Sequence, residues 1–226
     1  MKRLLAITLF AVACPTAASS DSMLGARFDD TALCYPASYD PGTTFMDAVL
    51  ASIEDQLDDS SGERLIYVPA EKIRELVPTY TENHTNDFGA VVAHDVMGIA
   101  YPLTSISDPD HMAKQAWNVR AGIESYFVEP DPDLPYFRIY PFKEPYSSWS
   151  LVKSPPPESP VTDPPKDWYI ANCTERLGNW SCRQVATYRS VYYKYRIHQQ
   201  DFQVREEVRD AVTELLRGWH QNCEFE

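Results

Sequence analysis

The chain lacks the short motifs that mark the best-known enzyme classes. Its eight glycines form no phosphate-cradling cluster, and no serine stands between two glycines as in a nucleophile elbow. Histidine pairs at the four-residue spacing of zinc proteases are missing. From motifs alone we therefore predict no catalytic residue, no metal site and no cofactor, and we lean towards a protein that is not an enzyme.

Long apolar runs are also scarce. One run of ten residues, 4–13, follows Lys2 and Arg3 and precedes small residues at 17–20. It is too short to span a bilayer, for which a helix needs about twenty residues. The order of positive charge, apolar run and small residues is typical of a signal peptide over residues 1–20. We expect a protein exported to the periplasm or the extracellular space, with no transmembrane segment.

Cys14 leaves the processing of this segment open. The residues before Cys14 loosely resemble a bacterial lipobox, in which the cysteine is lipidated and becomes the new N-terminus. The alternative is that Cys14 is removed with the signal peptide. A lipid anchor at Cys14 and simple cleavage after residues 17–20 are both compatible with the pattern.

Cys-x-x-Cys pairs are absent, which argues against a redox-active site. Beyond Cys14, the four cysteines are an even number, which in an exported chain predicts two disulfides. Cys173 and Cys182 flank a loop containing a Gly-Asn turn pair, so two strands joined there would bring them opposite each other. We predict a Cys173–Cys182 bridge, which leaves Cys34 to pair with Cys223.

Basic residues are scarce in the first part of the chain. The net charge of the whole chain is −13; residues 21–165 hold 9 Lys and Arg against 24 Asp and Glu, whereas residues 166–226 hold 9 of each. A strongly negative surface repels nucleic acid and favours a basic protein partner. The densest acidic stretch is 54–63, where Asp55, Asp58 and Asp59 are candidate partner-binding residues.

Proline concentrates in residues 154–166, with six prolines in thirteen positions. Proline fixes its own φ and lacks a hydrogen-bond donor, so this segment is expected to be an extended linker. We predict an acidic α+β domain over 21–153, and a strand-strand-helix segment over 167–226 that docks on it.

Hydrophobic periodicity predicts a mixed fold. Expected helices are 44–57, 70–77 and one starting at Asp108, and expected strands include 64–68, 168–173 and a long one over 181–197 that bends near Ser190. The last helix has one apolar stripe: Val204, Val208, Ala211, Val212, Leu215 and Trp219. Strands and helices without regular alternation indicate an α+β fold with a largely antiparallel sheet and packed helices, stabilised by disulfides.

Histidines offer one weak candidate site. His94-Asp95 lies in an apolar stretch, preceded by His84 and Asp87 and followed by Asp108, Asp110 and His111. A metal or hydrolase site could be assembled from these residues, but solvated loop residues explain them more simply. His198 and His220 belong to no motif.

Residues 183–205 mix tyrosines with arginines, which fits a half-buried strand better than a nucleic-acid surface, with a protein interface as a third reading. By elimination, the leading hypothesis is an exported protein-binding domain, concretely a toxin-neutralising immunity or inhibitor protein. The alternatives are a secreted hydrolase without a recognisable motif and an envelope-structural or assembly factor.

Overall fold

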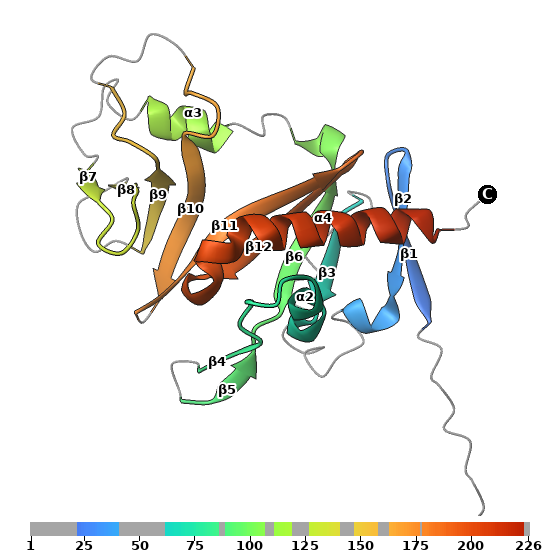
Figure 1. Cartoon of the computed structure of the whole chain (residues 1–226). Coiled ribbons are helices and arrows are strands. Elements are labelled where there is room, and N and C mark those ends of the chain that lie inside the picture. The colour runs from blue at the N-terminus through green and yellow to red at the C-terminus, as the bar shows by residue number, and fades with distance from the viewer. Residues whose placement is uncertain are drawn as a thin grey trace, which may run out of the picture.

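The computed structural model describes residues 22–40, 62–85, 89–106, 111–118, 127–140, 147–157, 163–176 and 178–223 (Figure 1). Several sequence-based expectations lie outside these residues: the signal peptide with Cys14, the helix over 44–57, the helix start at Asp108, and the acidic residues Asp55, Asp58 and Asp59.

Eight antiparallel strands form one sheet, in the order β3-β6-β12-β11-β10-β9-β8-β7. The strands are β3 (Arg64–Val68), β6 (Val96–Pro102), β7 (Phe127–Pro130), β8 (Phe137–Tyr140), β9 (Ser148–Val152), β10 (Tyr169–Arg176), β11 (Asn179–Tyr188) and β12 (Val191–His198). β9 pairs with β10, and β6 pairs with β12. Strands from both sides of the proline-rich segment thus share the sheet, while the predicted domain limits stay a prediction.

Two hairpins and a few helices complete the described fold (Figure 1). The hairpins are β1 (Met23–Phe28) with β2 (Thr31–Pro36), and β4 (Asn83–Thr85) with β5 (Val91–Ala93). The α-helices are α2 (Ala70–Leu76), α3 (His111–Trp117) and α4 (Arg205–Gln221); the 3-10 helices are η1 (Ala37–Tyr39), η4 (Leu103–Ser105) and η5 (Gln199–Val204). A large antiparallel sheet with a few helices is consistent with the predicted α+β class.

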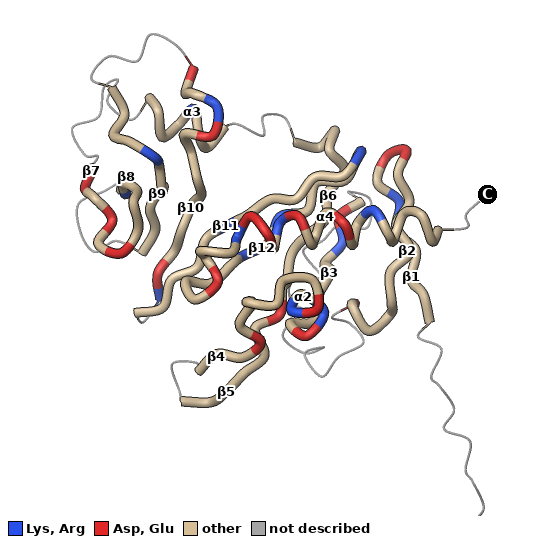
Figure 2. Tube along the Cα trace, in the orientation of Figure 1, with Lys and Arg blue, Asp and Glu red and all other residues tan. Residues whose placement is uncertain are grey.

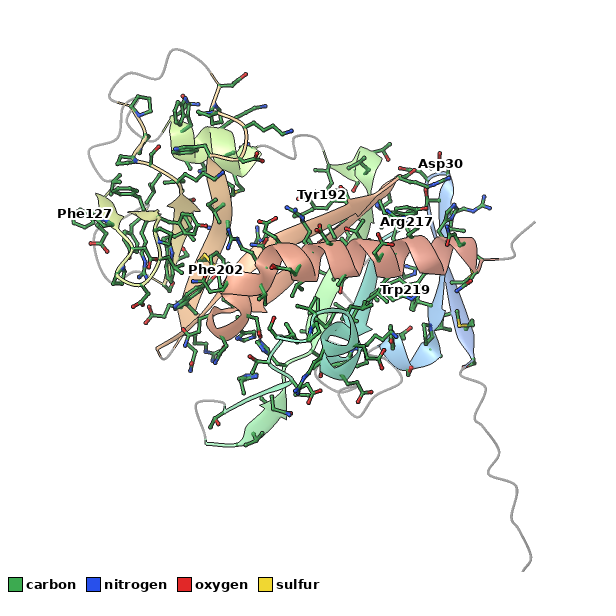
Figure 3. The ribbon with its side chains drawn as sticks, viewed as in Figure 1. Asp30, Phe127, Tyr192, Phe202, Arg217 and Trp219 are labelled. Atoms are coloured by element: carbon green, nitrogen blue, oxygen red, sulfur yellow. A yellow bond between two sulfur atoms is a disulfide. The ribbon has the colours of Figure 1, made fainter. Side chains whose placement is uncertain are left out.

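The main core lies between α4 and the sheet (Figure 1). The helix buries Val208, Ala211, Val212, Leu216 and Trp219. Four of these residues belong to the expected stripe; Leu216 is buried in place of the expected Leu215, and Val204 lies in η5. Figure 3 shows Trp219 near the C-terminal end of α4, beside β1 and β2. There its ring lies 5.7 Å from that of Tyr35 and 5.8 Å from that of Tyr39, which joins the first hairpin to the last helix.

The four cysteines pair as expected from their spacing. Cys34 on β2 is bonded to Cys223, just beyond α4. Cys173 and Cys182 are directly opposite each other on β10 and β11, and are bonded there. The first bridge closes nearly the whole described chain, and by restricting the unfolded state such a bridge contributes about 2–5 kcal/mol to the free energy of unfolding. Among the described residues, no helix is long and apolar enough to cross a membrane.

The long strand predicted over 181–197 is wrong in one respect. The chain forms two strands, β11 and β12, which pair antiparallel around a tight turn at Arg189 and Ser190. Arg189 has a φ of 49°, the left-handed conformation that such a turn requires. Residues on either side of a two-residue turn lie opposite each other and share a face of the sheet. The alternation of faces therefore shifts by one residue at the turn, which a single-strand reading misses.

This shift decides which side chains enter the core. On β12 the odd-numbered residues are buried, with Tyr193 and Tyr195 each 1 % exposed. On β11 the even-numbered residues face the same way, since Ala186 is opposite Tyr193 and Cys182 is opposite Ile197. The tyrosines at 193 and 195 are thus core residues, while the arginines of the Tyr/Arg run at 183 and 196 lie on the other face of the sheet.

Gly98 on β6 allows β12 to approach closely. A Cβ atom at this position would lie 2.6 Å from the carbonyl oxygen of Lys194, 2.7 Å from the Tyr193 ring and 2.8 Å from the Cβ of Tyr195. Gly98→Ala should therefore lower the free energy of unfolding by about 1–3 kcal/mol, the usual cost of overpacking a core. Chemical denaturation measures this difference.

Gly218→Ala is the matched control. Gly218 lies in α4 with open space around its Cα, and alanine favours the helix by about 0.8–1 kcal/mol over glycine. The control should be as stable as the parent chain or more stable. A Gly98→Ala chain as stable as the parent would contradict the tight β6–β12 contact.

Candidate functional site

A row of polar side chains crosses the face of the sheet that points away from α4. Thr174 on β10 is opposite Ser181 on β11, and Ser181 is opposite His198 on β12. Directly opposed residues share a face, so these three side chains form one row. The neighbouring core-side row holds the Cys173–Cys182 disulfide and Ile197. The strands are thus apolar on one side and carry hydroxyl and imidazole groups on the other.

A buried contact between a histidine and an aspartate lies next to this row. His94 lies just before β6 and Asp201 lies in η5, and their side chains are 2 % and 1 % exposed. Nδ1 of His94 is 2.7 Å from Oδ2 of Asp201 and 3.2 Å from the carbonyl oxygen of Thr81. The backbone N–H of Thr81 donates to Oδ1 of Asp201 at 2.8 Å. The carboxylate therefore joins the β4 side of the molecule to the end of β12.

This environment fixes the proton on His94. Both neighbours of Nδ1 are acceptors, so Nδ1 must carry a hydrogen, and in the neutral ring Nε2 keeps the free electron pair. Nε2 is buried and has no hydrogen-bond partner among the described residues. The ring itself is held by Tyr80, which stacks on it at 5.4 Å and donates from its hydroxyl to the His94 carbonyl at 2.5 Å.

Three imidazole rings pack against one another at this point. The ring centroids of His94 and His198 are 4.3 Å apart, those of His84 and His94 are 4.9 Å apart, and those of His84 and His198 are 5.0 Å apart. His84 comes from β4 and His198 from the end of β12. In the described part of the chain, no group of three or more His, Cys, Asp or Glu side chains is arranged to hold a metal ion.

The cluster keeps His198 uncharged at neutral pH. Burial lowers the pKa of His198 to about 4, assisted by the positive charge that His94 and His84 would carry. Asp201 acts in the opposite direction, and Arg196 lowers the pKa further. A neutral imidazole can accept a proton, so His198 has the protonation state that a general base needs.

His198 and His84 line a cavity of about 450 Å³ at the end of strands β10 to β12. Figure 2 shows both signs of charge at the lower end of β10, where Glu175 and Arg176 line this cavity. Figure 3 shows Phe202, the residue after Asp201, where η5 leads into α4. The cavity is lined by His84, Thr174, Glu175, Arg176, Asn179, Trp180, Ser181, Arg196, His198 and Gln200. We refer to it as the histidine pocket.

The structure brings together only part of the site considered from the sequence. His84 and His94 are in contact, but Asp95 accepts hydrogen bonds from Tyr67 and from the backbone of Ala70, at the start of α2. His111 is exposed on α3. Asp87, Asp108 and Asp110 lie outside the described residues, as do Asp55, Asp58 and Asp59.

Sequence reasoning missed His198 and Asp201 as members of the site. They come from the far end of the chain, and only the pairing of β12 with β6 places them beside His94. The one local signal is a His and an Asp three positions apart at the end of a strand, which is weak without the fold. No known protein family, curated protein or solved structure matches the chain.

The low pKa of His198 makes stability depend on pH in a defined direction. The pKa is about 4 in the folded protein and 6.5 in the unfolded reference, so between these values the unfolded chain binds the proton preferentially. The contribution of His198 to the free energy of unfolding is complete above about pH 6.5 and is lost as the pH falls towards 4. We expect His198→Asn to flatten this part of the pH dependence, measured by urea denaturation.

His111→Asn is the control for this experiment. His111 is exposed on α3, away from the pocket. The control chain should keep the pH dependence of the parent. Equal slopes for the parent and His198→Asn chains between pH 6.5 and 4 would contradict the assignment of a neutral, buried His198.

Proposed function

We propose that the protein is an exported hydrolase that uses His198 as a general base in the histidine pocket. One observation carries the proposal: an uncharged imidazole that lines the histidine pocket packs against a second imidazole, whose Nδ1 lies 2.7 Å from a buried carboxylate. A nucleophile or base that is oriented by a third group is the recurring arrangement of hydrolytic sites. The two disulfides are compatible with export.

The proposed step is the attack of water on an ester. The free ring nitrogen of His198 takes one proton from water, and the water oxygen forms a bond to the electrophilic atom of the ester. The bond from that atom to the leaving oxygen breaks, and the leaving oxygen takes the proton back from the imidazolium. The products are an acid and an alcohol, and no other reactant is needed.

His94 and Asp201 are positioning residues in this scheme, because neither is among the residues that line the cavity. Nδ1 of His94 lies between Oδ2 of Asp201 and the Thr81 carbonyl oxygen, two acceptors that favour the tautomer with the proton on Nδ1, and the His94 ring contacts His198 edge to face, at 71° between planes. The negative charge of Asp201 raises the pKa of His198 and so offsets part of the lowering that burial causes. The base strength of His198 thus depends on groups that the substrate does not touch.

His198→Asn should lower kcat for ester hydrolysis by about 100-fold or more, since positioned proton transfer contributes about 10²–10⁴-fold. The assay uses the full chain with p-nitrophenyl acetate, p-nitrophenyl phosphate and bis-p-nitrophenyl phosphate between pH 4 and 8. Activity of the parent should fall below about pH 4, where His198 becomes protonated. His111→Asn should keep parental activity. No turnover of any ester by the folded parent chain would refute the proposal.

Asp201→Asn tests the positioning role. The amide keeps an oxygen for the Thr81 N–H but presents an NH₂ group to Nδ1 of His94, which favours the wrong tautomer. We expect kcat to fall while KM changes little, because the cavity lining is intact. A purely structural role would instead lower the amount of folded enzyme and leave the kcat of the folded fraction unchanged.

A second proposal rests on charge: an exported domain that binds a basic protein, as a toxin-neutralising immunity or inhibitor protein does. The net charge of −13 and the concentration of acid in residues 21–165 support it. Such a surface speeds the association of a basic partner, most strongly at low salt. An envelope-structural or assembly role would use the same surface.

The acidic residues Asp55, Asp58 and Asp59 are the test of this second proposal. Affinity capture from the native host with the tagged chain provides the partner. Replacing all three residues by Asn should slow association with that partner and flatten its dependence on salt, measured by surface plasmon resonance. An unchanged rate and salt slope would show that this acidity does not steer binding.

A further inference from the structure

Two arginines oppose each other directly on the polar face of the sheet. Arg183 on β11 is the cross-strand neighbour of Arg196 on β12. Such neighbours have Cβ atoms about 4.5–5.5 Å apart, and like charges in this position destabilise a sheet. Burial lowers the pKa of Arg196, and the positive charge of Arg183 lowers it further. The chain therefore keeps a repulsive pair at a position where a neutral residue would be more stable.

No carboxylate of the described residues neutralises this pair. Nη1 of Arg196 donates to Oγ1 of Thr174 at 3.2 Å and to Oγ of Ser181 at 3.1 Å, and both acceptors are uncharged hydroxyls. Other arginines of the chain do form ion pairs, for example Arg138 with the buried Asp131 at 2.6 Å. Among the described residues, Arg196 thus has hydrogen-bond partners but no carboxylate partner, although the chain has an excess of acid.

A third arginine lies on the other side of the hydroxyl row. Arg176 is opposite Asn179, at the end of the β10–β11 hairpin, and lines the same cavity as Arg196. Residues two apart on a strand point to the same face and are about 6.6 Å apart. Arg176 therefore lies in the row on one side of the hydroxyl row, and Arg196 lies in the row on its other side. The cavity therefore has cationic groups on both sides of neutral hydroxyl and imidazole groups, and among the described residues Glu175 is the acidic residue that lines it.

We propose that the histidine pocket binds the phosphate group of a phosphate ester, held by Arg196 and Arg176 beside His198. The bound anion offsets the repulsion between Arg183 and Arg196 that the free protein carries. The inference names the substrate class of the proposed hydrolase and rests on the same pocket, but phosphate binding itself requires no catalysis.

The donors in the pocket suit a phosphate better than a carboxylate. A phosphate monoester carries a charge of about −1.5 to −2 at neutral pH and presents three strong acceptor oxygens. Guanidinium groups match such oxygens with paired N–H donors. One arginine suffices for a carboxylate, whereas this cavity has two, together with the hydroxyls of Thr174 and Ser181 and the amide of Asn179.

Thermal unfolding of the full chain with inorganic phosphate, phenyl phosphate, sulfate or acetate tests the inference. Phosphate and phenyl phosphate should raise Tm, and acetate should not. Arg196→Gln should weaken phosphate binding about tenfold or more in calorimetric titration. Without ligand its Tm should equal or exceed that of the parent, because the repulsive pair is gone. Arg27→Gln, at an exposed position on β1, is the matched control and should behave as the parent.

The outcomes distinguish the ligands and the two proposals. Tighter binding of phenyl phosphate than of inorganic phosphate supports an ester, and the reverse order assigns the site to free phosphate. Equal binding of sulfate and phosphate, or phosphate binding unchanged in Arg196→Gln, overturns the inference. Phosphate binding with no turnover of any ester leaves the inference standing and removes the hydrolase. Hydrolysis of p-nitrophenyl acetate without phosphate binding leaves the hydrolase standing and overturns the inference.

Discussion

The buried carboxylate of Asp201 is the group on which the arrangement of the site depends. Its side chain is 1 % exposed, so its charge must be compensated within the protein. It is compensated by the backbone N–H of Thr81 and by the His94 ring. Both lie in the segment before β6, whereas Asp201 follows β12. The compensation of one charge thus fixes the position of the β4–β5 hairpin, and with it His84, relative to the end of the sheet.

The two faces of the β10–β11–β12 segment explain why this position is suitable for a site. On the core side, the Cys173–Cys182 disulfide links β10 to β11, and Ile197 on β12 packs in the same core as the buried residues of α4. On the other side, the same three strands present Thr174, Ser181 and His198 in register. An apolar layer therefore lies behind the polar row, and His84 from β4 packs against the His198 end of that row.

Sequence periodicity predicted those helices and strands well that bury one face and expose the other. The strand at 64–68, the helix from Ala70 and the stripe of α4 are set by neighbours within one or two turns of chain. The disulfide pairing also followed from spacing, because the Gly178 turn brings Cys173 and Cys182 together. The β11–β12 turn was harder to find, since Arg189 and Ser190 are not the residues that usually mark a tight hairpin.

The site could not be predicted from the sequence, for a different physical reason. Contact between His94 and His198 is created by the antiparallel pairing of β6 with β12, a long-range contact that no local pattern encodes. The Tyr/Arg run is a related case. Its tyrosines and arginines alternate as a half-buried strand requires, yet only the register shows that two of its arginines, Arg183 and Arg196, are directly opposed. The candidate functional residues are therefore brought together by the pairing of strands, and not by their spacing in the sequence.

The acidity of the chain and the cations of the pocket act over different distances. The net charge of −13 acts on encounter, most strongly at low salt, because exposed charges are screened beyond about 8 Å at physiological ionic strength. The arginines act on contact, once the ligand is in the pocket. An anionic ester is repelled on approach, and added salt speeds its encounter with the pocket. A basic protein is attracted on approach, and added salt slows its association. The catalytic and the protein-binding roles proposed for this chain thus respond to salt with opposite signs, because only one of them opposes the field of the whole protein.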